Sequence, residues 1–319
     1  MKLNRRNLLA AAVIVGLGMG PASAAGDKLI AGIVFQQDQF FRALQIGMQA
    51  AAKKAGYELL EANSESKPDK EQSLINTYIS RGVDAIIISP IGESASAPAL
   101  KRAADAGIKV VTYNSTVKGD IATAFLNSSQ TQIGETTGVE AAKFIKEKLG
   151  GKAKIGVLQF KSLLPEQSGA RVNGFLSKVK GDGVDIVADQ DAWLAEKAVA
   201  VAGDIITANP DINIIFAANE GGTVGAVQAV RNAGKQGKIF VFGTDGSEQL
   251  ANFLLAEDDV LQAVTAQKPY EMGVLSVETA IAAIEGKPVE KTIIVPVQGL
   301  SRTDPAGVKA FAESLKQFK

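Results

Sequence analysis

The sequence predicts an α/β fold of two similar doubly wound parallel-sheet lobes joined by a three-crossing hinge. Segments with strand patterns and segments with helix patterns alternate along the chain, as in parallel sheets covered by helices on both faces. The alternation pauses at Gly150-Gly151 and then starts again. The chain has 319 residues, and a single hydrophobic core stops growing at about 250–300 residues, so two lobes are expected.

The first half opens with the apolar run 29–35, which predicts a buried strand, followed by a helix that ends at Gly56. Further strands are predicted at 57–62, 83–89, 108–114 and 121–127, and further helices at about 69–81 and 94–106. Gly56, Gly82 and Gly107 each precede a strand, where glycine supplies the left-handed residue that ends a helix.

The second half repeats this pattern after a long helix predicted at about 130–149. Strands are predicted at 153–160, 184–189, 212–218, 238–244, 261–266 and 292–298, and helices at about 166–180, 194–208, 221–233, from 247, 270–285 and from 305. We place the three hinge crossings near Asn127, Gln267 and Val295. The N-terminal lobe then comprises residues 25–127 plus 268–294, and the C-terminal lobe residues 128–267 plus 295–319.

The first residues of the chain have the pattern of a secretory signal peptide. Lys2, Arg5 and Arg6 precede an apolar stretch that ends in small residues, which predicts cleavage after Ala24 and a periplasmic mature protein. Arg5-Arg6 leaves twin-arginine export open beside the general route. Without the three basic residues of this segment, 31 of the 34 basic residues remain against 34 acidic ones, so the sequence offers no basic surface for nucleic acid.

Cysteine and histidine are both absent from the chain. Their absence excludes disulfides, thiol nucleophiles, Ser-His and Cys-His dyads and the commonest metal ligand. The sequence also lacks a phosphate-binding loop and a dinucleotide fingerprint, because its glycine clusters have the wrong spacing. We therefore expect a binding protein without catalytic residues, metal or cofactor.

Polar and aromatic residues follow the predicted strands, where open parallel sheets bind their ligands. They are Gln37, Asp38, Phe40, Phe41, Ser89, Asn114, Ser115, Asn127 and Ser128 in the first half, and Lys161, Trp193, Asn219, Glu220, Asp245 and Gln267 in the second. Almost all are amides, carboxylates, hydroxyls or flat rings. Such groups suit hydrogen bonding to vicinal hydroxyls together with stacking on the C–H face of a sugar.

Several of these residues have a structural alternative that the local sequence does not exclude. Phe40 and Phe41 could be core residues covering a helix start, and Asp245 could cap the helix that begins near Ser247. Trp193, the single tryptophan, could pack a helix against the core. Arg171 lies in the first turns of a predicted helix and could be a solvated surface charge.

Eight features of the chain resemble one known family, in order and at its spacing. They are the signal peptide, DQFFRALQIG (38–47), RGVDAIIISP (81–90), AGIKVVTYN (106–114), RVNGF (171–175), FAANEGGTVGA (216–226), VFGTDGS (241–247) and TAQKPYEMG (265–273). The chain is similar to the periplasmic sugar-binding proteins of the ribose- and galactose-binding type (type I), which feed ABC importers. The resemblance covers nearly all of the mature chain.

The resemblance implies a role for each candidate residue. It implies that Phe40 and Phe41 stack on one face of the sugar, with Asp38 at the neighbouring polar position, and that Trp193 covers the other face. It also implies polar contacts to the sugar, made by Arg171, Asn219, Asp245 and Gln267. Asn114-Ser115 stands where many relatives have an Asp-Arg pair, so the hydroxyl pattern should differ and a hexose, a furanose form or a sugar alcohol is as suitable as a pentose.

The predicted function is therefore capture of a monosaccharide or sugar alcohol between closing lobes and delivery to an ABC permease in the inner membrane, with a chemoreceptor as a further candidate partner. One alternative keeps the fold and binds an amino acid or signal molecule. Another is an exported hydrolase, which would need a nucleophile activated without histidine. A transcriptional regulator of the same lobe type would need an amino-terminal helix-turn-helix, where this chain has an export signal instead.

Overall fold

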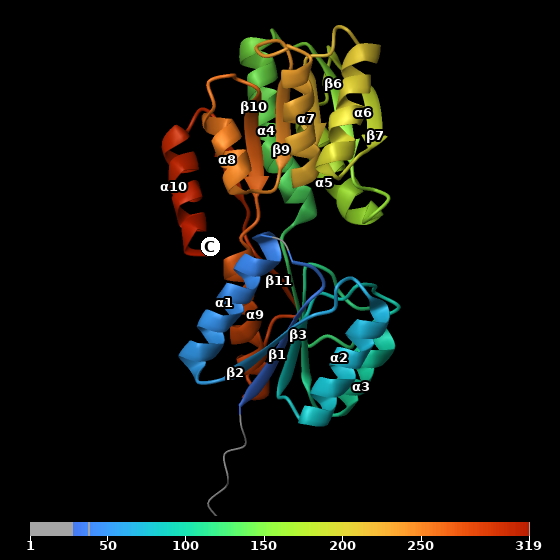
Figure 1. Cartoon of the computed structure of the whole chain (residues 1–319), viewed down its shortest axis with the longest axis vertical. Coiled ribbons are helices and arrows are strands. Elements are labelled where there is room, and N and C mark those ends of the chain that lie inside the picture. Colours follow the sequence, from blue (N-terminus) through green and yellow to red (C-terminus); the bar gives the residue numbers. More distant parts are fainter. Residues whose placement is uncertain (1–27, 38, 319) are drawn as a thin grey trace, which may run out of the picture.

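The computed structural model describes residues 28–37 and 39–318. Within them the chain forms two α/β lobes, one above the other in Figure 1. Each lobe contains a six-stranded sheet between two layers of helices. The predicted fold class is confirmed. The predicted signal peptide and Asp38 lie outside the described residues.

The N-terminal lobe is built on a parallel sheet with the strand order β11-β5-β4-β3-β1-β2. Its strands are β1 (Leu29–Val34), β2 (Glu58–Asn63), β3 (Ala85–Ile88), β4 (Lys109–Tyr113), β5 (Ala124–Asn127) and β11 (Thr292–Ile294). Its helices are α1 (Gln39–Ala55), α2 (Pro68–Arg81), α3 (Ala97–Asp105) and α9 (Pro269–Ile284). Helices α1 and α9 cover one face, and α2 and α3 the other.

The C-terminal lobe repeats this order as β12-β10-β9-β8-β6-β7, and only β12 runs antiparallel to its neighbour. Its strands are β6 (Ala153–Gln159), β7 (Val184–Asp191), β8 (Ile214–Ala217), β9 (Phe240–Thr244), β10 (Leu261–Ala266) and β12 (Gln298–Ser301). Its helices are α4 (Gln130–Lys148), α5 (Pro165–Val179), α6 (Ala195–Ala208), α7 (Glu220–Asn232), α8 (Glu248–Leu255) and α10 (Pro305–Leu315), followed by the short turn η1 (Lys316–Phe318). Helices α4 and α5 cover one face, and the others cover the opposite face.

The inner strands of each sheet are almost wholly buried because helices cover both faces of the sheet, whereas the edge strands β2 and β7 also carry exposed polar residues. In β3, Ile87 packs under α1 and α9, whereas Ile86 and Ile88 pack under α2 and α3. All three side chains are fully buried. Since a strand alternates its side chains between two faces, one continuous apolar run supplies two cores.

The predicted glycine helix ends are also observed. Gly56, Gly82 and Gly107 have positive φ angles of 74°, 67° and 86°. Gly82 ends α2 in the left-handed conformation, and its backbone N–H bonds to the carbonyls of Ile79 and Tyr78. A side chain would strain this backbone, so the glycine allows α2 to turn directly into β3.

The prediction of a single strand at 292–298 is wrong. Residues 292–294 form β11 in the N-terminal sheet, and residues 298–301 form β12 in the C-terminal sheet. The intervening segment crosses between the lobes, and the Val295 N–H donates to the Asn127 carbonyl at 2.8 Å. An apolar run with strand propensity does not reveal which sheet pairs with each half, because that choice is made by long-range contacts.

Within residues 28–37 and 39–318 the chain passes between the two sheets at three places: from β5 to α4, from β10 to α9 and from β11 to β12. Beside these crossings the C-terminal turn reaches the other lobe, where Phe318 stacks on Tyr270 of α9 with ring centroids 5.1 Å apart. Figure 1 shows this end of the chain close to α1. The lobes therefore touch at the hinge through side chains as well as through the three crossings.

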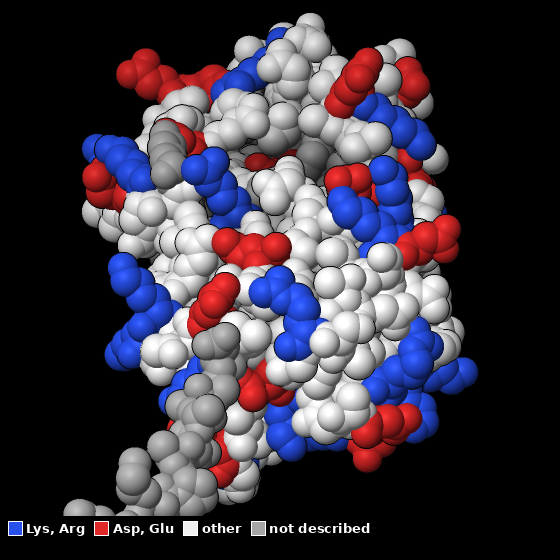
Figure 2. Space-filling view, turned by 60° about the horizontal axis from the view of Figure 1, so that its bottom comes forward, with Lys and Arg blue, Asp and Glu red and all other residues white. Residues whose placement is uncertain are grey.

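The surface carries both signs of charge. Figure 2 shows lysine and arginine interspersed with aspartate and glutamate over the face that it displays. Among the helices that the structure describes, none has the length and apolar character needed to cross a bilayer.

Candidate functional site

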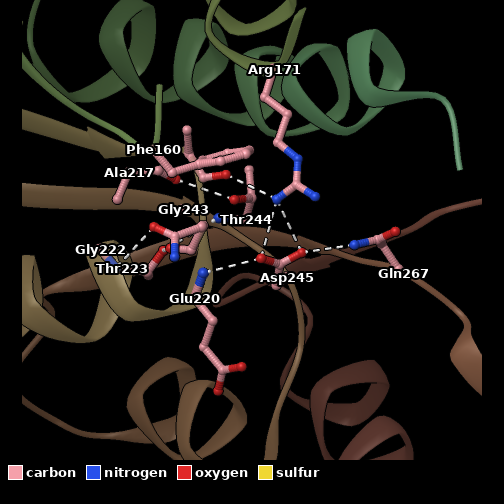
Figure 3. Close-up of polar contacts among 12 residues, drawn as sticks. Phe160, Arg171, Ala217, Glu220, Gly222, Thr223, Gly243, Thr244, Asp245 and Gln267 are labelled. Carbon is pink, nitrogen blue, oxygen red and sulfur yellow. Dashed lines mark hydrogen bonds and ion pairs between the residues drawn. The ribbon is translucent and has the colours of Figure 1, made fainter. Parts of the chain in front are cut away.

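Arg171 and Asp245 form a partly buried ion pair at the strand ends of the C-terminal lobe (Figure 3). Arg171 lies on α5, and Asp245 directly follows β9. The Nη1 atom of Arg171 donates to both carboxylate oxygens, at 3.2 Å to Oδ1 and 3.1 Å to Oδ2. The side chains are 6% and 22% exposed, so the interaction is shielded from bulk water while the carboxylate stays partly accessible. Charge-assisted bonds in such a position are stronger than neutral ones.

Both members of the pair have further partners. The carboxylate of Asp245 accepts from the Glu220 backbone N–H at 3.0 Å and from Gln267 Nε2 at 3.1 Å. The Nη1 atom of Arg171 also donates to the Ala218 carbonyl at 2.9 Å, and its guanidinium lies over the ring of Phe160, 5.2 Å from the centroid. The two side chains are therefore held in place before any ligand binds.

This geometry excludes the structural alternatives that the sequence left open for Arg171 and for Asp245. Arg171 is buried, so it is not a solvated surface charge. Asp245 does not cap α8, because the Ser247 hydroxyl accepts from the Leu250 N–H at 3.3 Å and performs that role. Asp245 instead adopts a positive φ of 68°, which directs the backbone out of the sheet at the strand end.

Asn219 and Trp193 lie together at the start of α7. The Asn219 side chain accepts from the Gly222 N–H at 3.1 Å and caps the helix, and its Nδ2 donates to the Trp193 carbonyl at 2.9 Å. A Cβ on Gly221 would lie 2.2 Å from that carbonyl, so only glycine allows this approach. Trp193 is half-buried and packs against the core below α4 and α5. Asn219 thus has a structural role, and its predicted contact to a ligand stays a prediction.

On the N-terminal lobe the two phenylalanines differ in burial. Phe41 is 3% exposed and belongs to the core, with its ring 4.7 Å from Phe35 and 5.2 Å from Phe40. Phe40 is only half-buried. The structure therefore places Phe41 as a support behind Phe40, and Phe40 is the ring of the two with accessible surface.

Asn114 follows β4 with a positive φ of 58° and is half-buried. Its Nδ2 donates to Ser89 Oγ at the long distance of 3.5 Å, and its carbonyl accepts from Gln167 Nε2 at 3.3 Å. Gln167 belongs to α5 of the other lobe. Asn114 therefore contacts the helix of the other lobe that also carries Arg171.

Two further residues were not predicted from the sequence. Gln167 touches the opposite lobe through Asn114, and Gln130 accepts a hydrogen bond from Arg171 Nε at 2.8 Å. Gln130 stands only three residues beyond Asn127, so a wider search of each strand end would have included it. Gln167 lies in the first turn of α5, where a glutamine carries no distinguishing pattern.

Comparison with known proteins identifies the family. A profile described as "periplasmic binding protein domain" matches residues 32–288, which is most of the chain. The chain belongs to the periplasmic binding protein family. This confirms the family predicted from the sequence motifs.

Named relatives of this periplasmic binding protein include transport proteins. It is 32% identical over 308 residues to the ABC transporter periplasmic-binding protein YphF of Escherichia coli, covering 94% of this chain and 93% of the relative. It is 31% identical over 261 residues to the ribose import binding protein RbsB of Bacillus subtilis, covering 81% and 82%. Both relatives match most of the two-lobed chain.

Solved structures agree with the fold. A periplasmic solute-binding protein from Actinobacillus succinogenes with bound D-allose has a TM-score of 0.79 and 25% identity, covering 88% of this chain and 100% of that one. A solute-binding protein from Agrobacterium vitis with bound α-D-tagatopyranose has a TM-score of 0.77 and 25% identity, covering 89% and 99%.

Proposed function

We propose that this periplasmic binding protein captures a monosaccharide or sugar alcohol between its two lobes and delivers it to an ABC importer. We take the N-terminal lobe as residues 25–127 with 268–294 and the C-terminal lobe as residues 128–267 with 295–319. The observation that carries it is the Arg171–Asp245 pair at the strand ends, ordered by Gln267 and by the Glu220 N–H. A relative named as a ribose import binding protein and structural neighbours with bound sugars support the same ligand class.

The charge of the pair favours a neutral ligand. Arg171 and Asp245 neutralise each other, and Asn114, Asn219 and Gln267 add uncharged amides, so Asp38 is the one remaining charged residue of the proposed site. An amino acid would instead need a separate anion-binding and cation-binding group for its two charges. Hydroxyl groups require only donors and acceptors, which paired charges and amides both supply.

The proposed site combines these polar groups with flat rings. Phe40 on the N-terminal lobe and Trp193 on the C-terminal lobe are both half-buried, which leaves part of each ring for the apolar face of a sugar. Asp38 completes the proposed site. A ligand that contacts both lobes stabilises the closed arrangement through contacts that the open one lacks. The closed lobes then form the surface for the permease, and a chemoreceptor could use the same surface.

The proposal contains no covalent step and places the protein in the periplasm after cleavage near Ala24. A thermal-shift screen over D-ribose, D-allose, D-tagatose, D-glucose, L-arabinose and myo-inositol, with glycine and glutamate as charged comparisons, tests it. A ligand that binds only the native state raises the melting temperature, and above Kd the stabilisation grows with the logarithm of the ligand concentration. The expected result is a shift with at least one sugar or polyol and none with the amino acids. A shift with the amino acids alone would contradict the proposal, and turnover of any sugar would contradict a purely binding role.

A further inference from the structure

Gln130 connects the binding arginine to the hinge. Its Oε1 accepts from Arg171 Nε at 2.8 Å. Its Nε2 donates to Asn127 Oδ1 at 3.2 Å and to the Ser128 carbonyl at 3.0 Å. Asn127 and Ser128 form the first crossing between the lobes, and Gln130 is the first residue of α4 beyond it. One buried amide therefore uses its acceptor on the ligand side and its donor on the hinge side.

The packing of α4 on α5 brings these two side chains together. A Cβ on Gly134 would lie 1.8 Å from the Arg171 carbonyl, and a Cβ on Gly174 would lie 2.2 Å from the Thr131 carbonyl. Such distances exclude any side chain at either glycine, so the two helix backbones lie in direct contact. The first turn of α4 is thereby fixed beside the guanidinium, and Gln130 is 9% exposed in this position.

The other crossings join the same network. Gln267, at the end of β10, donates to Asp245, and the Val295 N–H on the third crossing donates to the carbonyl of Asn127. Among the buried side-chain oxygens and nitrogens that the structure describes, the two without a hydrogen-bond partner are Ser128 Oγ and Gln267 Oε1. Both atoms lie on crossings beside this network, so two polar groups at the hinge remain without a hydrogen bond.

The third nitrogen of the Arg171 guanidinium, Nη2, has its orientation fixed by the bonds of the other two. Nε and Nη1 donate to Gln130, Ala218 and Asp245, whereas no described residue accepts from Nη2. With two of the three nitrogens fixed, the planar guanidinium cannot rotate without breaking buried hydrogen bonds. Gln130 holds the side of the guanidinium that Asp245 does not.

We infer that Gln130 is a positioning residue, which orients the Arg171 guanidinium for the ligand and couples it to the first hinge crossing. The inference rests on the proposed function for its ligand, but its first two tests need no sugar. Removal of the acceptor leaves Nε buried without a partner, and removal of the donor frees Asn127 and Ser128. The two halves of the amide are therefore separable by substitution.

Three variants separate the roles. Gln130→Met keeps the length of the side chain and removes both the acceptor and the donor. Gln130→Glu keeps an acceptor for Nε and removes the donor to Asn127 and Ser128. Gln132→Met makes the same change at an exposed glutamine of the same helical turn and serves as the control.

The first readout is hydrogen exchange of the Arg171 Nε–H by NMR in the ligand-free protein, with the signal assigned by its loss in Arg171→Lys. We expect at least tenfold faster exchange in Gln130→Met, and rates within threefold of wild type in Gln130→Glu and Gln132→Met. Equal acceleration in Gln130→Met and Gln130→Glu would show that Gln130 acts only by packing, and unchanged exchange in Gln130→Met would exclude the orienting role.

The second readout is the distance between the lobes. The chain has no cysteine, so Lys101→Cys on α3 and Lys197→Cys on α6 would be the only attachment sites for spin labels, and both positions are exposed. We expect a broader distance distribution in ligand-free Gln130→Met and Gln130→Glu than in wild type and Gln132→Met. A distribution identical to wild type in both Gln130 variants would overturn the coupling to the hinge.

The third readout is affinity for the sugar of the screening panel that raises the wild-type melting temperature most. We expect Gln130→Met to bind it at least tenfold more weakly and Gln130→Glu to recover part of that loss. Wild-type affinity in Gln130→Met would overturn the role in binding. If no sugar of the panel binds wild-type protein, the proposed function fails, while exchange and distance still decide the role of Gln130.

Discussion

Asn114 and Asp245 occupy equivalent positions in the two lobes. β4 and β9 stand at the same place in their six-stranded sheets, and each is followed by a residue with positive φ, 58° at Asn114 and 68° at Asp245. The partners differ. Asp245 is bound by Arg171, Gln267 and the Glu220 N–H, whereas the Asn114 side chain has one long contact to Ser89.

The lobes also differ in the partners that they give to a carboxylate held partly or wholly out of water. In the C-terminal lobe Asp245 is paired with a cation at the strand ends. In the N-terminal lobe Glu71 is 3% exposed and accepts from the Ser96 hydroxyl and from the Ile91 N–H at 2.9 Å, behind the loop that follows β3. The same backbone frame therefore carries an ordered ionic centre on one side and a neutral, weakly bonded amide on the other. For the proposed sugar site we expect the C-terminal lobe to fix the ligand and the N-terminal lobe to adapt to it.

The largest expected effect separates the two phenylalanines of the N-terminal lobe. Phe41→Ala removes a fully packed ring and should lower the free energy of unfolding by roughly 3–5 kcal/mol. Phe40→Ala should cost less stability and lose more sugar affinity, because part of its ring is accessible. Chemical denaturation and calorimetric titration of both variants measure the two quantities. Equal losses of stability would contradict the assignment of Phe41 to the core.

Asp245→Asn makes the C-terminal lobe resemble the N-terminal one at this position. Asparagine tolerates the positive φ, so the change acts on the charge and leaves the backbone in place. Arg171 then loses its counter-ion, and we expect roughly tenfold or greater loss of sugar affinity with a fall of roughly 1–3 kcal/mol in the free energy of unfolding.

The same logic applies to Arg171→Ala, which should weaken binding at least about tenfold while the fold is retained. Circular dichroism checks the fold, and calorimetry checks the affinity. Unchanged affinity in both Asp245→Asn and Arg171→Ala would remove the ion pair from the site.

Asn114→Gly tests the adaptable side. Glycine accepts a φ of 58° without strain, so stability should change by less than about 1 kcal/mol. Loss of the amide should weaken sugar binding by about threefold, a smaller effect than at Asp245, because a single uncharged hydrogen bond contributes about 0.5–1.5 kcal/mol. If Asn114→Gly weakened binding more than Asp245→Asn, the proposed division between the lobes would be reversed.

The smallest expected effect concerns pH. Burial raises the pKa of Glu71 above its ordinary value of 4.5, although hydrogen bonds from Ser96 and Ile91 oppose the shift. The folded state therefore holds this proton more tightly than the unfolded state. Its contribution to stability is present below pH 4.5 and is lost as the pH rises through the raised pKa. Glu71→Gln should flatten that part of the pH profile.

Glu65 supplies a control of opposite sign. Hydrogen bonds from Lys70 and Lys67 lower the pKa of this exposed carboxylate to about 2. The contribution of Glu65 to stability is present above pH 4.5 and is lost as the pH falls from 4.5 toward the lowered pKa of about 2. Glu65→Gln should therefore leave the shape of the stability profile above pH 4.5 unchanged. Urea unfolding of both variants from pH 4.5 to 7 checks the difference, and identical profiles would argue against the effect of burial at Glu71.

Much of the site could be predicted from the sequence because strand ends are recognisable locally. Asp245, Asn114 and Gln267 directly follow strands, and Asn219 lies two residues beyond β8. Parallel strands bring their carboxyl ends to one edge of a sheet. The roles of these residues were less predictable. For example, the sequence left open whether Asp245 caps the helix that begins near Ser247, and the hydrogen bond from the Leu250 N–H shows that Ser247 is the cap.

The sequence by itself determined the fold class and the helix ends at glycine, because periodicity and backbone preference act over a few neighbouring residues, and the resemblance of its motifs indicated the family. Tertiary structure decided which side chains pair. Gln130 and Arg171 are separated by 41 positions and meet because α4 and α5 pack glycine against backbone. The division of residues 292–298 between two sheets has the same cause, since strand pairing is settled by contacts distant in the chain.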